Sequence, residues 1–541
     1  VYSVPVGGRD GQTRTDPHVA PKEMRTIFLE PFRKAVQDAH VKGIMSSYND
    51  YDGEPITGSH KFLTGILRQE WGFDGYVVSD SEAVEFLYSK HGVADDAVDA
   101  AAQVINAGLN VRTNFTQPSD FILPLREAVR RGLVSEKTID DRVRDVLRVK
   151  FELGLFDNPY KGEAKNIDKS VHNKEHKDVS LQAALESIVL LKNQDGILPL
   201  DNNIKRVAVI GPNADEAENL ICRYGPANAP IKTVYQGIRE YLPAAEVKYA
   251  KGCDILDKYF PESELYDVPL DADEQRELDE AVNLARNSDV AILVLGGNEK
   301  TVREEYSRTS LDLCGRQEDL LKAVYATGTP VILVMVDGRA ASINWAQKYI
   351  PGIIHAWFPG EFMGDAVAQV LFGEYNPGGK LPVTFPKSVG QIPLAFPFKP
   401  GADSDGFVRV AHALYPFGYG LSYTTFAYSN LDISQSAPGV NGNVTVRCKV
   451  TNTGDRAGDE VVQLYLRDMV SSVTTYVKML RGFERVTLQP GESKIIEFTL
   501  TPQELGLWNK DEHFVVEPGE FKVMIGASSE DIRLEGKFEV I

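Results

Sequence analysis

The hydrophobic pattern changes twice along this chain, and each pattern belongs to a different class of fold. Residues 1 to about 159 alternate helical and strand-like segments, and a second such region starts at Gln182. Period-2 strands separated by regular turns fill the chain from about Phe426 onward. Because 541 residues exceed what one hydrophobic core can serve, the pattern predicts a multidomain α/β protein with a separate β-rich end.

The first region predicts helices with one buried face and short parallel strands joined by right-handed crossovers. The helical positions are Met24, Ile27, Phe28, Phe32, Ala35 and Val36, and then Ile139, Val143, Val146 and Leu147; the strands are Gly43–Asn49, Gly75–Asp80 and Leu109–Arg112. A (β/α)8 barrel needs eight strands and about 250 residues. We therefore interpret residues 1–160 as the C-terminal part of such a barrel, with Val1–Gly11 as a loop leaving a strand that precedes this sequence.

The second region, residues 181–375, follows a polar linker at 161–180 and predicts an open doubly wound sheet, an α/β sandwich. Its strands carry little alternation, as expected when helices cover both faces of a sheet. The predicted strands are Arg206–Ile210, Asp289–Leu295, Pro330–Val336 and Gly352–Trp357, and the predicted helices are Gln182–Leu191, Glu274–Ala285 and Gln317–Thr327.

Proline and glycine are dense in residues 376–426, which predicts an irregular connector that follows the surface. Residues 427–541 predict a β-sandwich of about seven strands, immunoglobulin-like or fibronectin-like. Its clearest strands are Asn443–Asn452, Glu460–Arg467, Ser493–Leu500 and Gly519–Ala527.

The charge balance narrows the class of partner. With 58 basic and 77 acidic residues the formal charge is -19, which argues against nucleic acid or an anionic membrane and suits a neutral substrate. No apolar run reaches transmembrane length, and residues 1–20 show no signal peptide. The four cysteines, Cys222, Cys253, Cys314 and Cys448, form no Cys-x-x-Cys pair, so only a single bridge such as Cys222–Cys253 stays open.

Several catalytic motifs are absent. The turn after Ile210 lacks Gly-x-Gly-x-x-Gly, the sequence holds no phosphate-binding Gly-x-x-x-x-Gly-Lys-Ser/Thr, and it holds no Gly-x-Ser-x-Gly elbow. His172 and His176 are four residues apart but not in the order His-Glu-x-x-His, which favours a solvated helical face. These observations argue against nucleotide binding, structural zinc and serine-hydrolase chemistry.

Acidic residues remain as candidates. Asp80 ends the predicted strand Gly75–Asp80, where it could be catalytic or could cap a helix over Glu82–Leu87. Glu304 and Glu305 lie in a loop after the strand ending at Leu295, where they could instead be surface acids paired with Arg303 or Arg308. Cleavage of an acetal needs two carboxyl groups in different environments, one ionised and one protonated.

Motifs along the whole chain resemble glycoside hydrolase family 3. They are Met45–Asn49, Leu67–Asp80, Val189–Asn193, Pro377–Pro382 and Tyr415–Tyr423, in the order of the family. The resemblance implies a barrel, an α/β sandwich and a fibronectin-III-like domain, and a retaining, exo-acting β-glycosidase.

The resemblance also implies roles for individual residues. Asp80 would be the nucleophile and Glu304 the general acid/base, with Glu305 as second choice and Arg308 as a supporting residue. Tyr48 would reach the nucleophile or the sugar, and Met45 would line the floor unless it packs in the core. Arg112 and Glu82 are further candidates for substrate binding. Neither a metal nor an organic cofactor is implied.

Two departures from the family pattern bear on specificity. The family's Lys-His pair and earlier barrel strands would lie before Val1, and a chain that truly lacks them would favour a non-catalytic carbohydrate-binding relative. Ser81 replaces the Trp of many β-glucosidases, so that Asp80–Val84 is similar to β-xylosidases. We expect an exo-β-glucosidase acting on short β-glucosides, with β-xylosidase as the alternative. The resemblance favours a periplasmic or secreted location, and the β-sandwich could support a homodimer.

Overall fold

The chain divides into two units, Val1–Ser170 and Val171–Ile541. The computed structural model describes residues 16–160, 167–221, 224–225, 229–303, 306, 308–402, 410, 412–434 and 438–541. Val1–Gly11, Cys222, Glu304 and Glu305 therefore lie outside the described residues, and the expectations for them stay predictions.

The first unit alternates helices with very short strands. Its helices are α1 (Pro21–Glu23), η2 (Met24–Phe28), α2 (Glu30–Gln37), η3 (Ile56–Gly58), η4 (Lys61–Glu70), α3 (Phe86–Ser89), α4 (Ala97–Ala107), α5 (Ser119–Arg130), α6 (Glu136–Glu152) and α7 (Ile167–Ser170). Its strands are β1 (Gly43–Met45), β2 (Asp50–Tyr51), β3 (Glu54–Pro55) and β4 (Tyr76–Val78). The helices begin at polar caps where the sequence offers them: Asp96 accepts hydrogen bonds from the main chain of α4, and Ser135 from that of α6.

Strands β1 and β4 pair in parallel, with Gly43 opposite Tyr76, as the alternation with helices predicts. The predicted third strand is reduced to one parallel bridge between Val78 and Val111. The core beneath these strands holds Val77 and Leu109, both fully buried, with side chains from η4 and α4. This packing brings the carboxyl ends of all three segments to one edge.

One expectation for the first unit fails in part. The spacing of Ile139, Val143 and Leu147 correctly predicts helix α6, but Val143 and Leu147 are exposed. The described residues of this unit cover only part of the apolar face of the helix.

The second unit contains a six-stranded sheet with the order β5-β10-β9-β8-β6-β7. The strands are β5 (Val189–Asn193), β6 (Arg206–Ile210), β7 (Glu246–Ala250), β8 (Val290–Gly296), β9 (Val331–Val336) and β10 (Gly352–His355). All neighbours pair in parallel except β5, which lies antiparallel to β10. Every residue of β8 and β9 is buried, because helices cover both faces.

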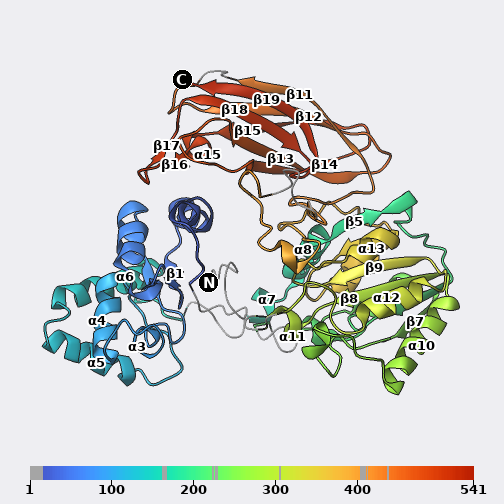
Figure 1. Ribbon diagram of the computed structural model, residues 1–541, viewed down its shortest axis with the longest axis horizontal. Helices are drawn as coiled ribbons and strands as arrows, with labels where there is room; N and C mark the ends of the chain where they lie inside the picture. Colours follow the sequence, from blue (N-terminus) through green and yellow to red (C-terminus); the bar gives the residue numbers. More distant parts are fainter. Residues whose placement is uncertain are drawn as a thin grey trace. The chain divides into compact units, whose positions relative to one another are not determined.

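Helices cover both faces of this sheet (Figure 1), and a hydrophobic cluster lies on each face. One face packs against α8 (Lys174–Ser187), α9 (Val234–Tyr241) and α14 (Met363–Leu371), and the other against α10 (Ala272–Arg286), α12 (Gln317–Tyr325) and α13 (Asn344–Tyr349). The described part of this region also holds the short helices η6 (Gln194–Gly196), η7 (Ala217–Leu220), η8 (Glu262–Glu264) and α11 (Glu299–Val302). The predicted doubly wound sheet is confirmed.

The predicted helix Gln182–Leu191 is wrong at its end. Helix α8 stops at Ser187, Ile188 is extended, and Val189–Asn193 form the antiparallel edge strand β5. A short apolar run fits a buried helix or a buried strand equally well. Pairing with β10 decides between them here.

The proline- and glycine-rich connector does not simply follow the surface. Its described residues form one short helix, η9 (Val389–Gln391), but Leu381, Phe385 and Tyr415 are buried in one of the two sheet clusters. Phe385 pairs with Tyr415, and Leu421 with Leu190, through isolated bridges. The prediction of a surface segment is wrong at these positions because their large side chains complete the core.

The C-terminal region is a β-sandwich of seven long strands, as predicted. One sheet has the order β11-β12-β15, with β11 (Phe426–Ser434), β12 (Val444–Asn452) and β15 (Ser493–Leu500). The other has the order β14-β13-β18-β19, with β13 (Gly458–Asp468), β14 (Met479–Leu488), β18 (Gly519–Gly526) and β19 (Ile532–Val540). Helix α15 (Pro502–Leu505) and the small hairpin β16 (Leu507–Trp508) and β17 (Phe514–Val515) lie between β15 and β18 in the chain.

Cys253, Cys314 and Cys448 are free thiols. The possible bridge between Cys222 and Cys253 involves a residue outside the described part of the chain. Within the described residues no helix combines the length and the apolar character needed to cross a membrane.

Candidate active site

Asp80 lies at the shared carboxyl edge of the strands in the first unit. The Ser46 N–H donates to the Val78 carbonyl at 2.8 Å, and the Asp80 N–H donates back to the Ser46 carbonyl at 3.2 Å. On the other side, the Ser79 N–H donates to the Val111 carbonyl at 2.8 Å. The main chain that carries Asp80 is thus fixed by a neighbour on each side.

The two oxygens of the Asp80 carboxylate differ. Oδ1 accepts a hydrogen bond from the Ser81 N–H at 2.7 Å, whereas Oδ2 is buried with no hydrogen-bond partner among the described residues. Helix α3 begins only at Phe86, with Glu85 at its N-cap position, so the interpretation of Asp80 as a helix cap is wrong. The carboxylate is held by one oxygen and leaves the other for a different partner.

Tyr48 and Met45 belong to the neighbouring segment at the same edge. Tyr48 is buried, its carbonyl accepts from Nε2 of His91 at 3.0 Å, and its ring centroid lies 6.1 Å from that of Phe86. Met45 is 42% exposed, so it does not pack in the core of this unit. Their predicted contacts with the sugar stay predictions.

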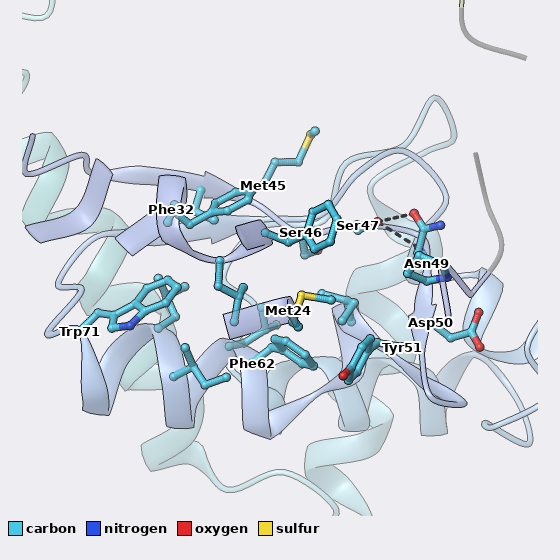
Figure 2. Close-up of a pocket in the computed structure, with 18 residues that line it drawn as sticks. Met24, Phe32, Met45, Ser46, Ser47, Asn49, Asp50, Tyr51, Phe62 and Trp71 are labelled. Atoms are coloured by element: carbon cyan, nitrogen blue, oxygen red, sulfur yellow. Dashed lines mark hydrogen bonds between the residues drawn. The ribbon is translucent and has the colours of Figure 1, made fainter. Parts of the chain in front are cut away.

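A cavity of 140 Å³ lies beside β1. Its lining is mostly apolar, with Met24, Phe32, Phe62 and Trp71, and its few polar residues, Ser46, Ser47, Asn49 and Asp50, are neighbours in the chain. Figure 2 shows the Met45 thioether directed away from the aromatic rings, and the Ser47 hydroxyl bonded to Asn49. A sugar needs several convergent polar groups, so this cavity is not a candidate for the sugar site.

Arg112 and Glu82 lie in different environments. The Arg112 guanidinium is buried against Glu85, and its Nη2 also donates to the Thr116 hydroxyl at 2.7 Å. Glu82 is exposed and its φ of 64° lies in the left-handed region, which is uncommon for a residue with a Cβ. Sequence reasoning missed Glu85, whose position five residues after Asp80 was the available signal.

In the second unit, the loop predicted to carry the acid/base leaves β8 through two glycines. Gly296 has a φ of 145°, and a Cβ there would collide with the Val336 carbonyl. Asn298 then caps α11 in a capping box with Thr301, which is fully buried. The start of this loop is therefore fixed against the sheet.

Arg308 fixes the other end of the same loop. Its Nε donates to Oε1 of Glu264 at 2.5 Å, and both side chains are almost completely buried. The second oxygen of Glu264 accepts from the N–H and the hydroxyl of Thr309. Among the described residues, the partners of the Arg308 guanidinium are thus Glu264 and the Asp312 carbonyl, and its supporting role stays a prediction.

Asp337 is a buried acid that sequence reasoning missed. It follows β9, is 7% exposed, and accepts a hydrogen bond from the Arg339 N–H at 2.9 Å. Burial raises its pKa to about 6, although the charges of Arg308 and Arg339 oppose the shift. The signal was its position after an apolar strand, one strand away from the loop of Glu304.

Asp80 belongs to the first unit and the loop after β8 to the second. The prediction that an acid from each unit shares one cleft stays a prediction.

Comparison with known families covers most of the chain. Residues 7–149 match the glycosyl hydrolase family 3 N-terminal domain, residues 188–423 match the C-terminal domain of that family, and residues 460–529 match a fibronectin type III-like domain. These three matches follow the order of the barrel part, the α/β sheet and the β-sandwich.

Individual proteins are similar over nearly the whole chain. A beta-xylosidase of Formosa agariphila is 38% identical over 94% of this chain and 70% of its own length, and a periplasmic beta-glucosidase of Salmonella typhimurium is 36% identical over 100% and 72%. A solved β-glucosidase from Erythrobacter marinus superposes with a TM-score of 0.91 at 35% identity, covering 99% of this chain and 72% of that one. The chain belongs to glycosyl hydrolase family 3.

Proposed function

We propose that this protein is a retaining exo-β-glucosidase that releases the non-reducing terminal glucose from short β-glucosides. One observation carries the proposal: Asp80 follows β4 with Oδ1 held by the Ser81 N–H and Oδ2 buried without a described partner. Leaving a buried carboxylate oxygen unpaired is costly, so such an atom supports a functional reading.

In the proposed reaction, Asp80 attacks the anomeric carbon while Glu304 gives a proton to the leaving glycosidic oxygen. The bond to the leaving group breaks and a covalent glycosyl-Asp80 ester forms. Glu304, now ionised, takes a proton from water, and the hydroxyl attacks the anomeric carbon and releases Asp80. Glu305 is the second choice for the acid/base, and Arg308 supports the loop that carries both.

β-Xylosidase is the alternative, and Ser81 is the observation that favours it. The sequence Asp80–Val84 is similar to β-xylosidases, and the relative from Formosa agariphila is named a beta-xylosidase. Comparing kcat/KM for an aryl β-glucoside and an aryl β-xyloside separates the two. We expect the glucoside to be preferred at least tenfold; the reverse order would establish the xylosidase.

The test of the nucleophile is covalent trapping with a 2-fluoro-glucoside that forms the glycosyl-enzyme quickly and loses it slowly. The full chain should gain one sugar mass on the peptide that contains Asp80, and Asp80→Ala should gain none. Asp120→Ala, an exposed carboxylate on α5, is the matched control and should label normally. Labelling of Asp80→Ala at another residue contradicts the assignment, and sugar binding without turnover supports a non-catalytic relative.

We also propose a periplasmic location, in line with the name of the relative from Salmonella typhimurium. Cell fractionation tests it. A homodimer through the β-sandwich stays a prediction, which sedimentation velocity tests.

A further inference from the structure

Arg339 binds the main chain on both sides of the predicted acid/base. Its Nε donates to the Thr301 carbonyl at 2.7 Å, and its Nη2 donates to the Tyr306 carbonyl at 2.9 Å. Thr301 precedes Glu304 by three residues and Tyr306 follows it by two. One planar guanidinium therefore sets the separation of the two points between which Glu304 and Glu305 lie in the chain.

From these contacts we infer that Arg339 is a positioning residue for the general acid/base of this enzyme. The inference rests on the proposed function, because it needs Glu304 or Glu305 to be the acid/base. It adds a residue that follows a different strand, β9, to the apparatus that performs proton transfer.

The support beneath Arg339 is rigid. Arg339 comes three residues after the end of β9, a fully buried strand inside the sheet. Its N–H is bound by the buried carboxyl of Asp337 at 2.9 Å. A side chain whose own main chain is fixed at the sheet loses little further freedom when it makes two hydrogen bonds.

The two ends of the loop are anchored separately from Arg339. On the first side, Thr301 is fully buried and its hydroxyl accepts from the Asn298 N–H at 3.0 Å. On the second side, Arg308 and Thr309 bind Glu264. Loss of Arg339 should therefore leave Thr301 and Arg308 anchored and remove only the link between the Thr301 and Tyr306 carbonyls.

The chemical consequence concerns one step. A general acid must lie within hydrogen-bond reach of the leaving oxygen, and a displacement of 1 Å can cost about 100-fold in rate. A glycoside with a poor leaving group needs that proton, whereas an activated aryl glycoside hardly does. Displacing the acid should thus change the ratio of the two rates, which a general loss of folded enzyme does not.

The test compares kcat/KM for phenyl β-glucoside and 2,4-dinitrophenyl β-glucoside. We expect Arg339→Met, which keeps the aliphatic stem, to lower the first by about 100-fold and the second by less than tenfold. Arg339→Lys should recover only a small part, because one ammonium cannot reproduce the planar fork. If Arg339→Met does not fold, as judged by circular dichroism, Arg339→Lys carries the same comparison.

Arg316→Met is the matched control. Arg316 is also largely buried in the second unit, and its described partners are the Val268 carbonyl, Glu274 and Asp319, none of which lies between Thr301 and Arg308. Arg316→Met should lower kcat/KM for both glucosides by the same factor, if it lowers them at all. Equal losses for the Arg339 variants would overturn the inference.

Glu304→Ala and Glu305→Ala in the same assay separate this inference from the proposed function. If the loss of kcat/KM depends strongly on the leaving group in one of these two variants but not in the Arg339 variants, the positioning role is wrong and the proposed function stands. If neither does, the acid/base assignment is wrong, and the positioning role falls with it.

Discussion

Arg112 donates to Oε1 of Glu85 from both Nε, at 2.8 Å, and Nη2, at 2.5 Å. The Arg112 side chain is 6% exposed, and Oε2 of Glu85 is buried with no hydrogen-bond partner in the described part of the chain. Arg112 follows Val111, which bridges to Val78 of β4, so this ion pair lies at the same strand edge as Asp80. The cation predicted to bind sugar is thus bound to a protein carboxylate.

This pair predicts a clear stability effect. Glu85→Ala should lower the free energy of unfolding by about 2 kcal/mol or more, because it leaves the Arg112 charge buried without its partner. Glu85→Ala combined with Arg112→Ala should recover part of that loss. Calorimetry of the full chain measures both.

The control for this pair is exposed. Glu127 on α5 also binds a guanidinium, that of Arg130, but this arginine side chain is 72% exposed. Glu127→Ala should change the unfolding temperature far less than Glu85→Ala. Similar losses for the two variants would mean that burial of the Arg112–Glu85 pair does not matter.

The second prediction concerns which of Glu304 and Glu305 is the general acid/base. Glu304→Ala should lose most activity on poor leaving groups, lose less on activated aryl glycosides, and recover with azide, an anion that attacks the glycosyl-enzyme in place of water and needs no general base. Steady-state kinetics with and without azide checks this. If Glu305→Ala gives that behaviour instead, the acid/base is one residue later in the chain.

The elements that local pattern decides could be predicted from the sequence. The bounds of β6 (Arg206–Ile210) and β15 (Ser493–Leu500) agree with prediction. The first is an apolar run and the second alternates apolar and polar residues, and turn residues bound each of them. Strand β5 could not be predicted, because only its pairing with β10 distinguishes it from a helix. The buried Phe385 and Tyr415 of the connector depend in the same way on a distant sheet.

The residues of the candidate site also differ in whether a local sequence pattern predicts them. Asp80 could be found because an acid at the end of an apolar strand is a local signal. The Arg112–Glu85 pair joins residues 27 apart, and the contact of Arg339 with Thr301 joins residues 38 apart. Neither leaves a mark in any short stretch of sequence, so the partners of each site residue had to come from the structure.

Asp337 predicts a loss of stability as pH rises. Its pKa is raised to about 6 by burial, so the folded state holds the proton more tightly than the unfolded state. The resulting stabilisation is complete below the unfolded pKa near 3.8 and is lost as pH rises through 6. Asp337→Asn keeps an oxygen that can accept from Arg339 and does not titrate.

The stability of Asp337→Asn relative to the natural protein should therefore increase between pH 5 and pH 8. One pKa unit is worth about 1.4 kcal/mol, so the expected increase is about 1 to 2 kcal/mol. Urea denaturation at the two pH values measures it. If the difference in stability between Asp337→Asn and the natural protein is the same at pH 5 and pH 8, the pKa of Asp337 is not raised.

His355 predicts the opposite dependence. It ends β10 fully buried, its Nδ1 accepts from the Trp357 N–H at 3.2 Å, and burial lowers its pKa to about 3. Because the unfolded pKa is near 6.5, the stabilisation is complete above that value and is lost as pH falls toward 3. At pH 5 this loss is about 2 kcal/mol.

His355→Asn can still accept a hydrogen bond from the Trp357 N–H but does not titrate. Its loss of stability relative to the natural protein should therefore shrink by about 2 kcal/mol between pH 7 and pH 5, as measured by urea denaturation. His176→Asn, exposed on α8, is the control, and an equal pH effect in both variants would contradict the role of burial.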